Sequence, residues 1–395
     1  MTIELLAPAG NLEKLKIAIQ YGADAIYIAG QRFSLRSAAN NFTIEDIKEA
    51  LLFARQRGKK VYITVNAFLH DDEIDQLPEY LAELHSVAPD ALICSDLGVV
   101  KLAQKHTGIP IHLSTQASVI NSDHAMIWKG EGVKRIVVGR ELTIKEAAYI
   151  KEKTGLEIEM FIHGAMCMAY SGHCAMSTYV AQRDSNRGGC IQNCRYLYNL
   201  YSQDHQISKS HVLSSKDLCG ISLIDDLIKA EIDSIKIEGR MKSNLYVAST
   251  VRAYANVIKE INQGKSSNFE NWKTELTKIP FRGYTEGSLK SEADLDSIYD
   301  PSYESGKDFK MAGTVLETDK DRHRFAFYVK NRLFPGDEIE VMTFDGSIET
   351  VTAKELINLA DQSLTIAQPN SIIWLPLKDG IEAQNVARIN RAATT

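Results

Sequence analysis

Four cysteines gathered in one short stretch are the side chains best suited to chemistry. The chain has six cysteines in 395 residues, and four of them follow the pattern Cys-x6-Cys-x15-Cys-x3-Cys, at Cys167, Cys174, Cys190 and Cys194. Glycines lie between them, and glycine lets a backbone wrap closely around a bound group and offer it N–H groups. Clustered cysteines in a cytosolic protein more often bind metal or do redox chemistry than form disulfides. The pattern therefore predicts one metal site on these four thiols.

The spacing also bears on which metal is bound. Structural zinc sites usually pair cysteines two to four residues apart, and only Cys190 and Cys194 fit that range. The wider first pair is easier to place around a cluster whose irons are spread in space. Spacing favours an iron–sulfur cluster, with zinc and four unrelated buried thiols as alternatives. Cys94 is expected in the core, and Cys219 is either a core residue or a reserve ligand.

The elements that must position these thiols alternate between strands and helices. Short β-branched runs are separated by amphipathic helical patterns over most of the first 240 residues, which is typical of parallel βαβ units. Eight such units close a barrel. The fold class expected is therefore α/β, a TIM-like (β/α)8 barrel, with an open doubly wound sheet as the alternative. The eight runs are residues 4–6, 25–28, 61–65, 91–94, 111–113, 135–138, 157–162 and 234–237.

The segment between the seventh and eighth strands departs from this alternation of strands and helices. It holds all four clustered cysteines and a predicted hairpin of residues 196–201 with 211–214. Insertions after barrel strands fall on the catalytic face. The domains expected are a barrel over residues 1–262, a linker over 263–310, and a small antiparallel β-barrel or sandwich over 311–395. The cluster-binding insertion is placed at 163–215.

Bulk composition is that of an ordinary water-soluble protein. The chain is 44% hydrophobic and 24% charged, with a net charge of −6, which does not by itself indicate a nucleic-acid binder. The N-terminus lacks the features of a signal peptide, and no apolar run is long enough to span a membrane. We therefore expect a cytoplasmic protein with no membrane partner.

Four stretches resemble one protein family, the collagenase-like peptidases of peptidase family U32. The stretch around the first two cysteines looks like the family signature, and the resemblance covers nearly the whole chain. The four stretches are Glu159-x-Phe161-x-x-Gly164-Ala-Met-Cys167-x6-Cys174-Ala-Met-Ser177, Leu5-Leu-Ala-Pro8-Ala-Gly10-Asn11, Ser215-Lys-Asp217-Leu, and Ile235-Lys236-Ile237-Glu238-Gly239-Arg240-Met-Lys242-Ser243.

The resemblance implies an RNA hydroxylase, because bacterial members of this family include such enzymes. It implies a [4Fe-4S] cluster on Cys167, Cys174, Cys190 and Cys194. It also implies formation of 5-hydroxyuridine at the wobble position of tRNA, with prephenate, a small dianionic metabolite, as a required co-substrate. The implied partners are tRNA and a possible second subunit of the same family.

Two other functions stay open at this stage. The family carries a peptidase label, and Cys167 has His163 and His173 nearby in sequence as candidate bases. Four metal-bound thiolates would, however, leave no free nucleophile. We find no His-Glu-x-x-His or Gly-x-Ser-x-Gly motif. The third candidate is a zinc-stabilised RNA-binding protein without catalysis.

Polar residues just past the barrel strands are the candidate site residues, since these positions face the catalytic mouth. Two of Arg36, Arg140 and Arg240 are expected to bind the two carboxylates of prephenate, because guanidinium pairs bidentately with carboxylate. Surface ion pairs are the alternative for each. The substrate-binding set predicted is Arg36, Asn66, Gln116, Arg140 and Arg240, and the catalytic candidates are His163 and Glu238. His163 is equally compatible with a buried structural role.

Basic residues form two candidate RNA-binding surfaces. One surrounds the cysteines, and the other lies in the C-terminal domain among aromatic residues that alternate along a strand. Alternating aromatics more often face a core than stack on bases. The first set is Arg183, Arg187 and Arg195; the second is Lys320, Arg322, His323, Arg324, Lys330 and Arg332, with Phe325, Phe327 and Tyr328.

Overall fold

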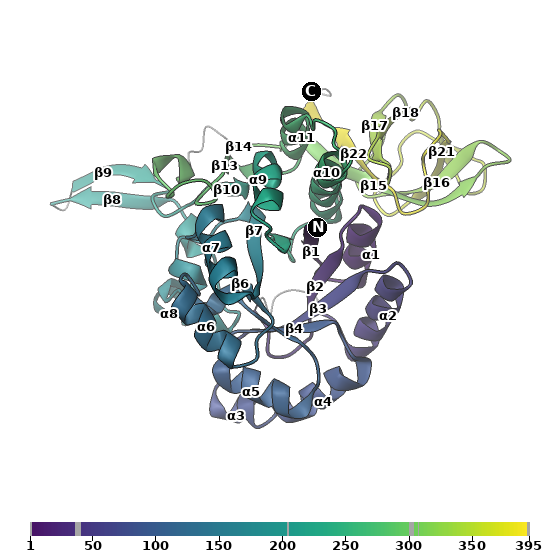
Figure 1. The fold of residues 1–395 in the computed structure, drawn as a ribbon. Helices are drawn as coiled ribbons and strands as arrows, with labels where there is room; N and C mark the ends of the chain where they lie inside the picture. The colour runs from purple at the N-terminus through teal and green to yellow at the C-terminus, as the bar shows by residue number, and fades with distance from the viewer. Residues whose placement is uncertain (1, 36–40, 204, 300–303, 307, 393–395) are drawn as a thin grey trace.

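Eight parallel strands form a closed barrel in this computed structural model, which describes residues 2–35, 41–203, 205–299, 304–306 and 308–392 (Figure 1). The strands pair in chain order from β1 to β7, and β11 pairs with both β1 and β7. The predicted closed barrel is confirmed. The strands are β1 (Glu4–Pro8), β2 (Ala25–Ala29), β3 (Lys60–Val65), β4 (Ala91–Cys94), β5 (Ile111–Leu113), β6 (Arg135–Val137), β7 (Glu157–Ala165) and β11 (Ser234–Ile237).

Amphipathic helices cover the outside of the barrel. In α7, a capping box between Thr143 and Glu146 begins the helix, and Gly155 ends it in the left-handed conformation. Two helices, α3 and α4, follow β3, and Pro78 in the first turn of α4 favours a new helix start. The helices are α1 (Leu12–Gln20), α2 (Ile44–Arg55), α3 (Asp71–Ile74), α4 (Leu77–Val87), α5 (Leu97–His106), α6 (Ser122–Gly130), α7 (Ile144–Thr154), α9 (Ile224–Lys229) and α10 (Asn244–Asn262).

Charged side chains on several strands are buried within the barrel. Arg135 on β6 contacts Glu4 at 2.5 Å and Glu159 at 3.4 Å, and the Lys236 ammonium lies 2.8 Å from Glu159. Burial, partly offset by Glu159, lowers the pKa of Lys236. Buried charges persist only when they are paired in this way. The network ties β1, β6, β7 and β11 together inside the barrel.

The insertion after β7 carries a projecting hairpin of β8 (Tyr198–Ser202) and β9 (His205–Ser210) (Figure 1). The prediction of its second strand at residues 211–214 is wrong. The chain reverses directly after Ser202, where Gln203 has a φ of 48°, and Tyr198 pairs with Ser210. Beside the hairpin, the insertion contains α8 (Met176–Ala181) and several 3-10 turns, and it returns to the barrel through β10 (Asp217–Cys219), which pairs antiparallel with β7.

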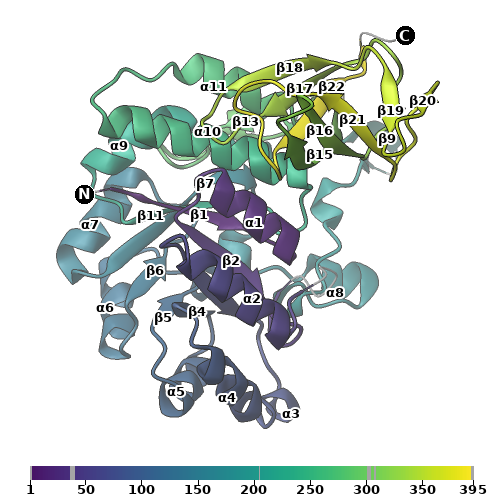
Figure 2. The ribbon, with the colours of Figure 1, turned by 90° about the vertical axis from the view of Figure 1, so that its right-hand side faces the viewer.

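An antiparallel, curled eight-stranded sheet forms the C-terminal part of the chain (Figure 2). Phe325 and Phe327 are fully buried in its own core, as expected for alternating aromatics. The segment before it contains α11 (Phe269–Leu276), β12 (Phe281–Arg282), β13 (Tyr284–Thr285) and β14 (Glu304–Ser305). The sheet comprises β15 (Phe309–Asp319), β16 (Arg324–Val329), β17 (Glu338–Met342), β18 (Ile348–Thr352), β19 (Leu356–Asn358), β20 (Ser363–Leu364), β21 (Ile372–Pro376) and β22 (Val386–Asn390).

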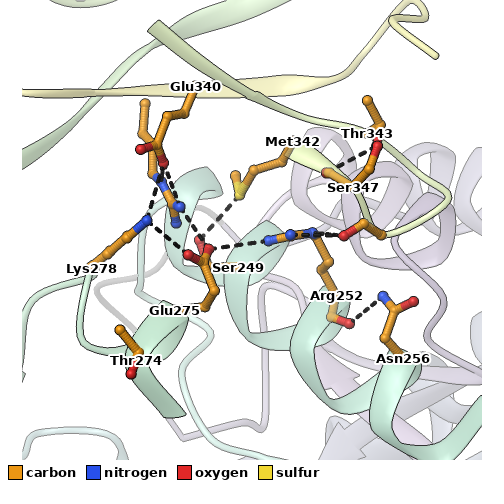
Figure 3. A network of polar contacts seen from close by, with 12 residues as sticks. Ser249, Arg252, Asn256, Thr274, Glu275, Lys278, Glu340, Met342, Thr343 and Ser347 are labelled. Atoms are coloured by element: carbon orange, nitrogen blue, oxygen red, sulfur yellow. Dashed lines mark hydrogen bonds and ion pairs between the residues drawn. The ribbon is translucent and has the colours of Figure 1, made fainter. Parts of the chain in front are cut away.

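A polar network joins this sheet to the barrel (Figure 3). Arg388 on β22 is fully buried and lies 2.6 Å from both Glu275 on α11 and Glu340 on β17. Burial opposes ionisation of Glu275, but Arg388 and Lys278 more than offset it and lower its pKa to about 2. Tyr21, at the end of α1, donates to the Met342 carbonyl and accepts from the Val386 N–H. The two parts are therefore held by directional contacts.

Candidate functional site

All four clustered cysteines line one cavity at the carboxyl ends of the barrel strands. Residues that follow four different strands line the same cavity, as the barrel geometry requires. They come from the ends of β3, β5, β6 and β11, and the predicted residues among them are Asn66, Gln116, Arg140, Glu238 and Arg240. The structure therefore brings together, in one place, every predicted cysteine and five of the other predicted residues. Arg36 lies outside the described residues.

The loop that carries the cysteines is fixed by its own hydrogen bonds. The Asn186 side chain accepts from the Cys174 N–H at 3.3 Å and donates to the Cys174 carbonyl at 3.2 Å. Gly172 has a φ of 83°, and a Cβ there would lie 2.2 Å from the Gln116 Oε1. A positive φ favours glycine, and any larger residue here would force the Gln116 side chain to move. The contacts of Asn186 and Gly172 hold the loop that carries Cys174 close to Gln116, which follows β5.

The donor set has the chemistry of an iron–sulfur site, because four cysteine thiols are the usual ligands of such clusters. Cys167 is exposed and the other three thiols are half-buried. Burial, reinforced by the three other thiols, raises the pKa of Cys194, and Arg195 opposes this shift. Within the described ranges, no three His, Cys, Asp or Glu side chains converge closely enough for a single metal ion. The four thiols line one cavity.

Two buried N–H donors near these thiols are unsatisfied. The Nη1 of Arg195 and the Nδ2 of Asn193 have no hydrogen-bond partner in the part of the chain that the structure describes. Arg195 is held in place through its Nη2, which donates to the Met166 carbonyl at 3.0 Å. Thiolates and inorganic sulfides accept hydrogen bonds from such donors. Unpaired donors on the two residues that flank Cys194 are therefore compatible with an iron–sulfur cluster.

Arg140 lines this mouth and has an unsatisfied side-chain donor. Among the described residues it makes no hydrogen bond or ion pair, its buried Nε is unsatisfied, and it lies 4.1 Å from the Phe161 ring centroid. Its neighbour Glu141 accepts instead from the N–H and hydroxyl of Ser171, at 2.7 and 2.8 Å. Arg140 is therefore available for a carboxylate or phosphate.

Arg240 and Asn66 hold the backbone after β2. Arg240 is 6% exposed and donates to the Ser34 hydroxyl and to the Leu35 carbonyl. The Asn66 Oδ1 accepts from the Leu35 N–H, and its Nδ2 donates to the Ser114 hydroxyl, both at 3.4 Å. These residues line the cavity while they organise its wall. Lys236, which sequence reasoning did not select, also lines it. The position of Lys236 on β11, with its side chain directed into the barrel, could have identified it as a cavity residue.

His163 does not line the cavity. It is 1% exposed and its Nδ1 lies 3.3 Å from the Tyr254 hydroxyl, with the Tyr246 and Tyr284 rings nearby. Burial lowers its pKa to about 3, so the imidazole is neutral at physiological pH. This location favours the structural alternative for His163. Glu238 does line the cavity, and its carbonyl accepts from the Tyr246 hydroxyl at 2.8 Å.

Cys94 and Cys219 lie apart from the four clustered thiols. Both are buried, and burial raises the pKa of Cys94 to about 12 and that of Cys219 to about 11. Neither lines the cysteine-containing cavity. High pKa values keep these thiols protonated, which is typical of structural cysteines.

The predicted basic surfaces are partly neutralised within the chain. Arg187 lies 2.6 Å from Glu73 and donates to the Phe68 carbonyl, whereas Arg183 is exposed. In the C-terminal sheet, Arg324 pairs with Asp319 and Asp361. Paired arginines contribute less to phosphate binding, so each surface keeps only part of its predicted positive charge for RNA.

Comparison with known proteins identifies the family of this chain. Residues 10–298 match the family model described as peptidase family U32, and residues 307–388 match its C-terminal domain. The chain belongs to peptidase family U32. No helix in the described parts of this U32 chain is long and apolar enough to cross a membrane.

Curated members of the U32 family with known names include RNA-modifying proteins. The tRNA hydroxylation protein P1 of Bacillus subtilis (strain 168) is 40% identical, over 88% of this chain and 86% of the relative. The tRNA hydroxylation protein P of Escherichia coli (strain K12) is 32% identical, over 96% and 94% respectively. A 23S rRNA 5-hydroxycytidine synthase of the same organism is 33% identical over 86% of this chain and 52% of that protein.

Proposed function

We propose that this protein hydroxylates the wobble uridine of tRNA to 5-hydroxyuridine, with a [4Fe-4S] cluster and prephenate as a co-substrate. The observation that carries the proposal is the cavity in which all four cysteines meet the strand-end residues of the barrel. Relatives named as tRNA hydroxylation proteins, similar over nearly their whole length, support the RNA substrate.

The proposed cluster would be held by Cys167, Cys174, Cys190 and Cys194. Such a cluster supplies an electron-transfer or Lewis-acid centre. The chain's own contribution is to fix the thiols through Asn186 and Gly172, and to offer the N–H groups of Arg195 and Asn193. Donors of this kind tune an iron–sulfur centre.

Prephenate is proposed to bind through Arg140. A guanidinium that has no carboxylate partner among the described residues attracts a dianion at this mouth. Arg240 supports the site by holding Ser34 and Leu35, so its loss would act through the shape of the wall. Glu238 is the proposed acid–base group, because it lines the cavity and His163 does not.

The experiment that tests the function is mass spectrometry of tRNA nucleosides from cells that lack the gene, with any redundant route to the same nucleoside also removed. We expect 5-hydroxyuridine derivatives to disappear and to return with the wild-type gene. Unchanged 5-hydroxyuridine in that background would contradict the proposal. Iron and sulfide analysis of anaerobically purified protein tests the cluster separately, and a colourless zinc protein would support the zinc alternative.

Proteolysis is the less favoured function. A cysteine nucleophile needs a base within hydrogen-bond reach. His163 is enclosed among tyrosines, and the Nε2 of His173 lies 2.5 Å from the Gln116 carbonyl oxygen. Cleavage of unfolded protein by the metal-free chain would reverse this preference.

A further inference from the structure

A second cavity lies on the other side of the residues that follow β7. Its volume is about 430 Å³, and it shares Arg140, Cys167 and Met168 with the cavity that holds the four cysteines. Residues 212–215, which follow the projecting hairpin, form a second wall, and Ser297 and Ile298 contribute a third. The two cavities are therefore neighbours that share one wall.

The second cavity has polar groups that lack partners. Ser214 is 2% exposed, and its buried hydroxyl has no hydrogen-bond partner within the described chain. The unsatisfied Nε of Arg140 belongs to the shared wall. Glu141 also lines the cavity, but its carboxylate is occupied by Ser171. An unsatisfied buried hydroxyl costs stability unless a ligand completes it.

The rim of the second cavity is apolar and open to solvent. Tyr170 is 53% exposed, Met168 44%, Ile298 43% and Val212 41%. Exposed aromatic and thioether side chains offer surfaces on which a flat ring can stack. An open rim suits a group that arrives attached to a large molecule.

We propose that this second cavity binds the target nucleobase after it leaves the RNA stack. The inference rests on the proposed function and names where the base is bound. A neutral pyrimidine suits walls that combine hydroxyls and thioethers with an apolar rim open to solvent. A base bound here would lie across Cys167 and Met168 from the cysteine-lined cavity.

A fluorine probe tests the proposal directly. A stem-loop RNA carries 5-fluorouridine at the loop position of the target, and ¹⁹F NMR reports the surroundings of C5 when the RNA binds the full-length protein. Val212→Trp fills the cavity from its exposed rim. Ile207→Trp, on the hairpin that precedes Val212, 65% exposed and away from the cavity lining, is the matched control. Fluorescence anisotropy measures RNA affinity for every variant.

We expect the ¹⁹F resonance to shift when wild-type protein or Ile207→Trp binds the RNA, and to stay at its free-loop position with Val212→Trp. Ser214→Ala should weaken binding of this RNA roughly 2- to 10-fold, the loss of about one hydrogen bond. A shift that survives Val212→Trp, or tight RNA binding without any shift, overturns the second cavity as the base site and leaves the proposed function standing. Failure of the wild-type protein to bind RNA at all overturns both.

Discussion

At the scale of single residues, burial separates the cysteines into two classes. The four that line the cavity are exposed or half-buried, whereas Cys94 and Cys219 are buried with raised pKa values. Thiolates bind metal and buried protonated thiols do not. The spacing of the four was visible in the sequence, but the exclusion of Cys219 required the fold.

Replacement of one cavity cysteine should remove the metal. We expect Cys174→Ser to lose most of its iron and sulfide, and to lower product formation at least 10- to 100-fold, the range found even for residues that only support metal ligands. Cys94→Ala is the matched control and should keep its iron. Iron and sulfide per chain are the measurement. Full iron in Cys174→Ser would contradict the proposed ligand set.

The buried His163 should make stability depend on pH. Its pKa is lowered from 6.5 to about 3 by burial, so below pH 6.5 the unfolded chain binds a proton that the folded chain does not. Stability is full above pH 6.5 and should fall by up to about 1.4 kcal/mol per pH unit as the pH drops toward 3. Urea unfolding between pH 7.5 and 5 checks this. His163→Phe should flatten the dependence, and His205→Phe, on the exposed hairpin, should not.

At the scale of elements, backbone geometry decides which loops can form the site. Gly172 has a positive φ and packs against Gln116, and Asn186 brackets Cys174. Periodicity predicted the barrel strands closely, because a buried parallel strand needs a continuous apolar run. It misplaced the second hairpin strand, because a tight turn after Ser202 leaves no sign in hydrophobic pattern.

Substitution of Gly172 should disturb the cysteine loop and leave the barrel folded. Gly172→Val introduces a strained positive φ, at roughly 1 to 3 kcal/mol, and a clash with Gln116. We expect reduced iron content with unchanged far-ultraviolet circular dichroism. Gly108→Val is the matched control, because a Cβ at Gly108 would meet no atom within 4 Å and the φ there is not positive. Normal iron in Gly172→Val would show that the loop tolerates the change.

At the scale of the whole molecule, buried charges join the barrel to the C-terminal sheet (Figure 3). Arg388, Glu275 and Glu340 come from three elements that are distant in sequence. Such a junction keeps the sheet in one orientation relative to α10 and α11. Sequence reasoning treated residues 263–310 as a linker, yet α11 and β13 within this range pack against other elements.

Removal of Arg388 should destabilise this junction. Arg388→Ala leaves Glu275 and Glu340 with fewer cationic partners, and we expect a loss of about 3 kcal/mol. Calorimetry should show a lower melting temperature, and limited proteolysis should show faster cleavage near residues 263–310. Lys229→Ala, which breaks an exposed pair with Asp225, should change neither. An unchanged melting temperature for Arg388→Ala would mean that apolar contacts alone hold the sheet.

Hydrophobic period and motif spacing are local properties, so the barrel, the four thiols and the strand-end residues could be predicted from the sequence. Which polar groups have hydrogen-bond partners became known only from the folded chain. His163 is buried among tyrosines, and Arg240 donates to the Leu35 carbonyl. The Nε of Arg140 has no hydrogen-bond partner among the described residues. Hydrogen bonds between side chains far apart in the sequence depend on the tertiary fold, and no local sequence pattern predicts them.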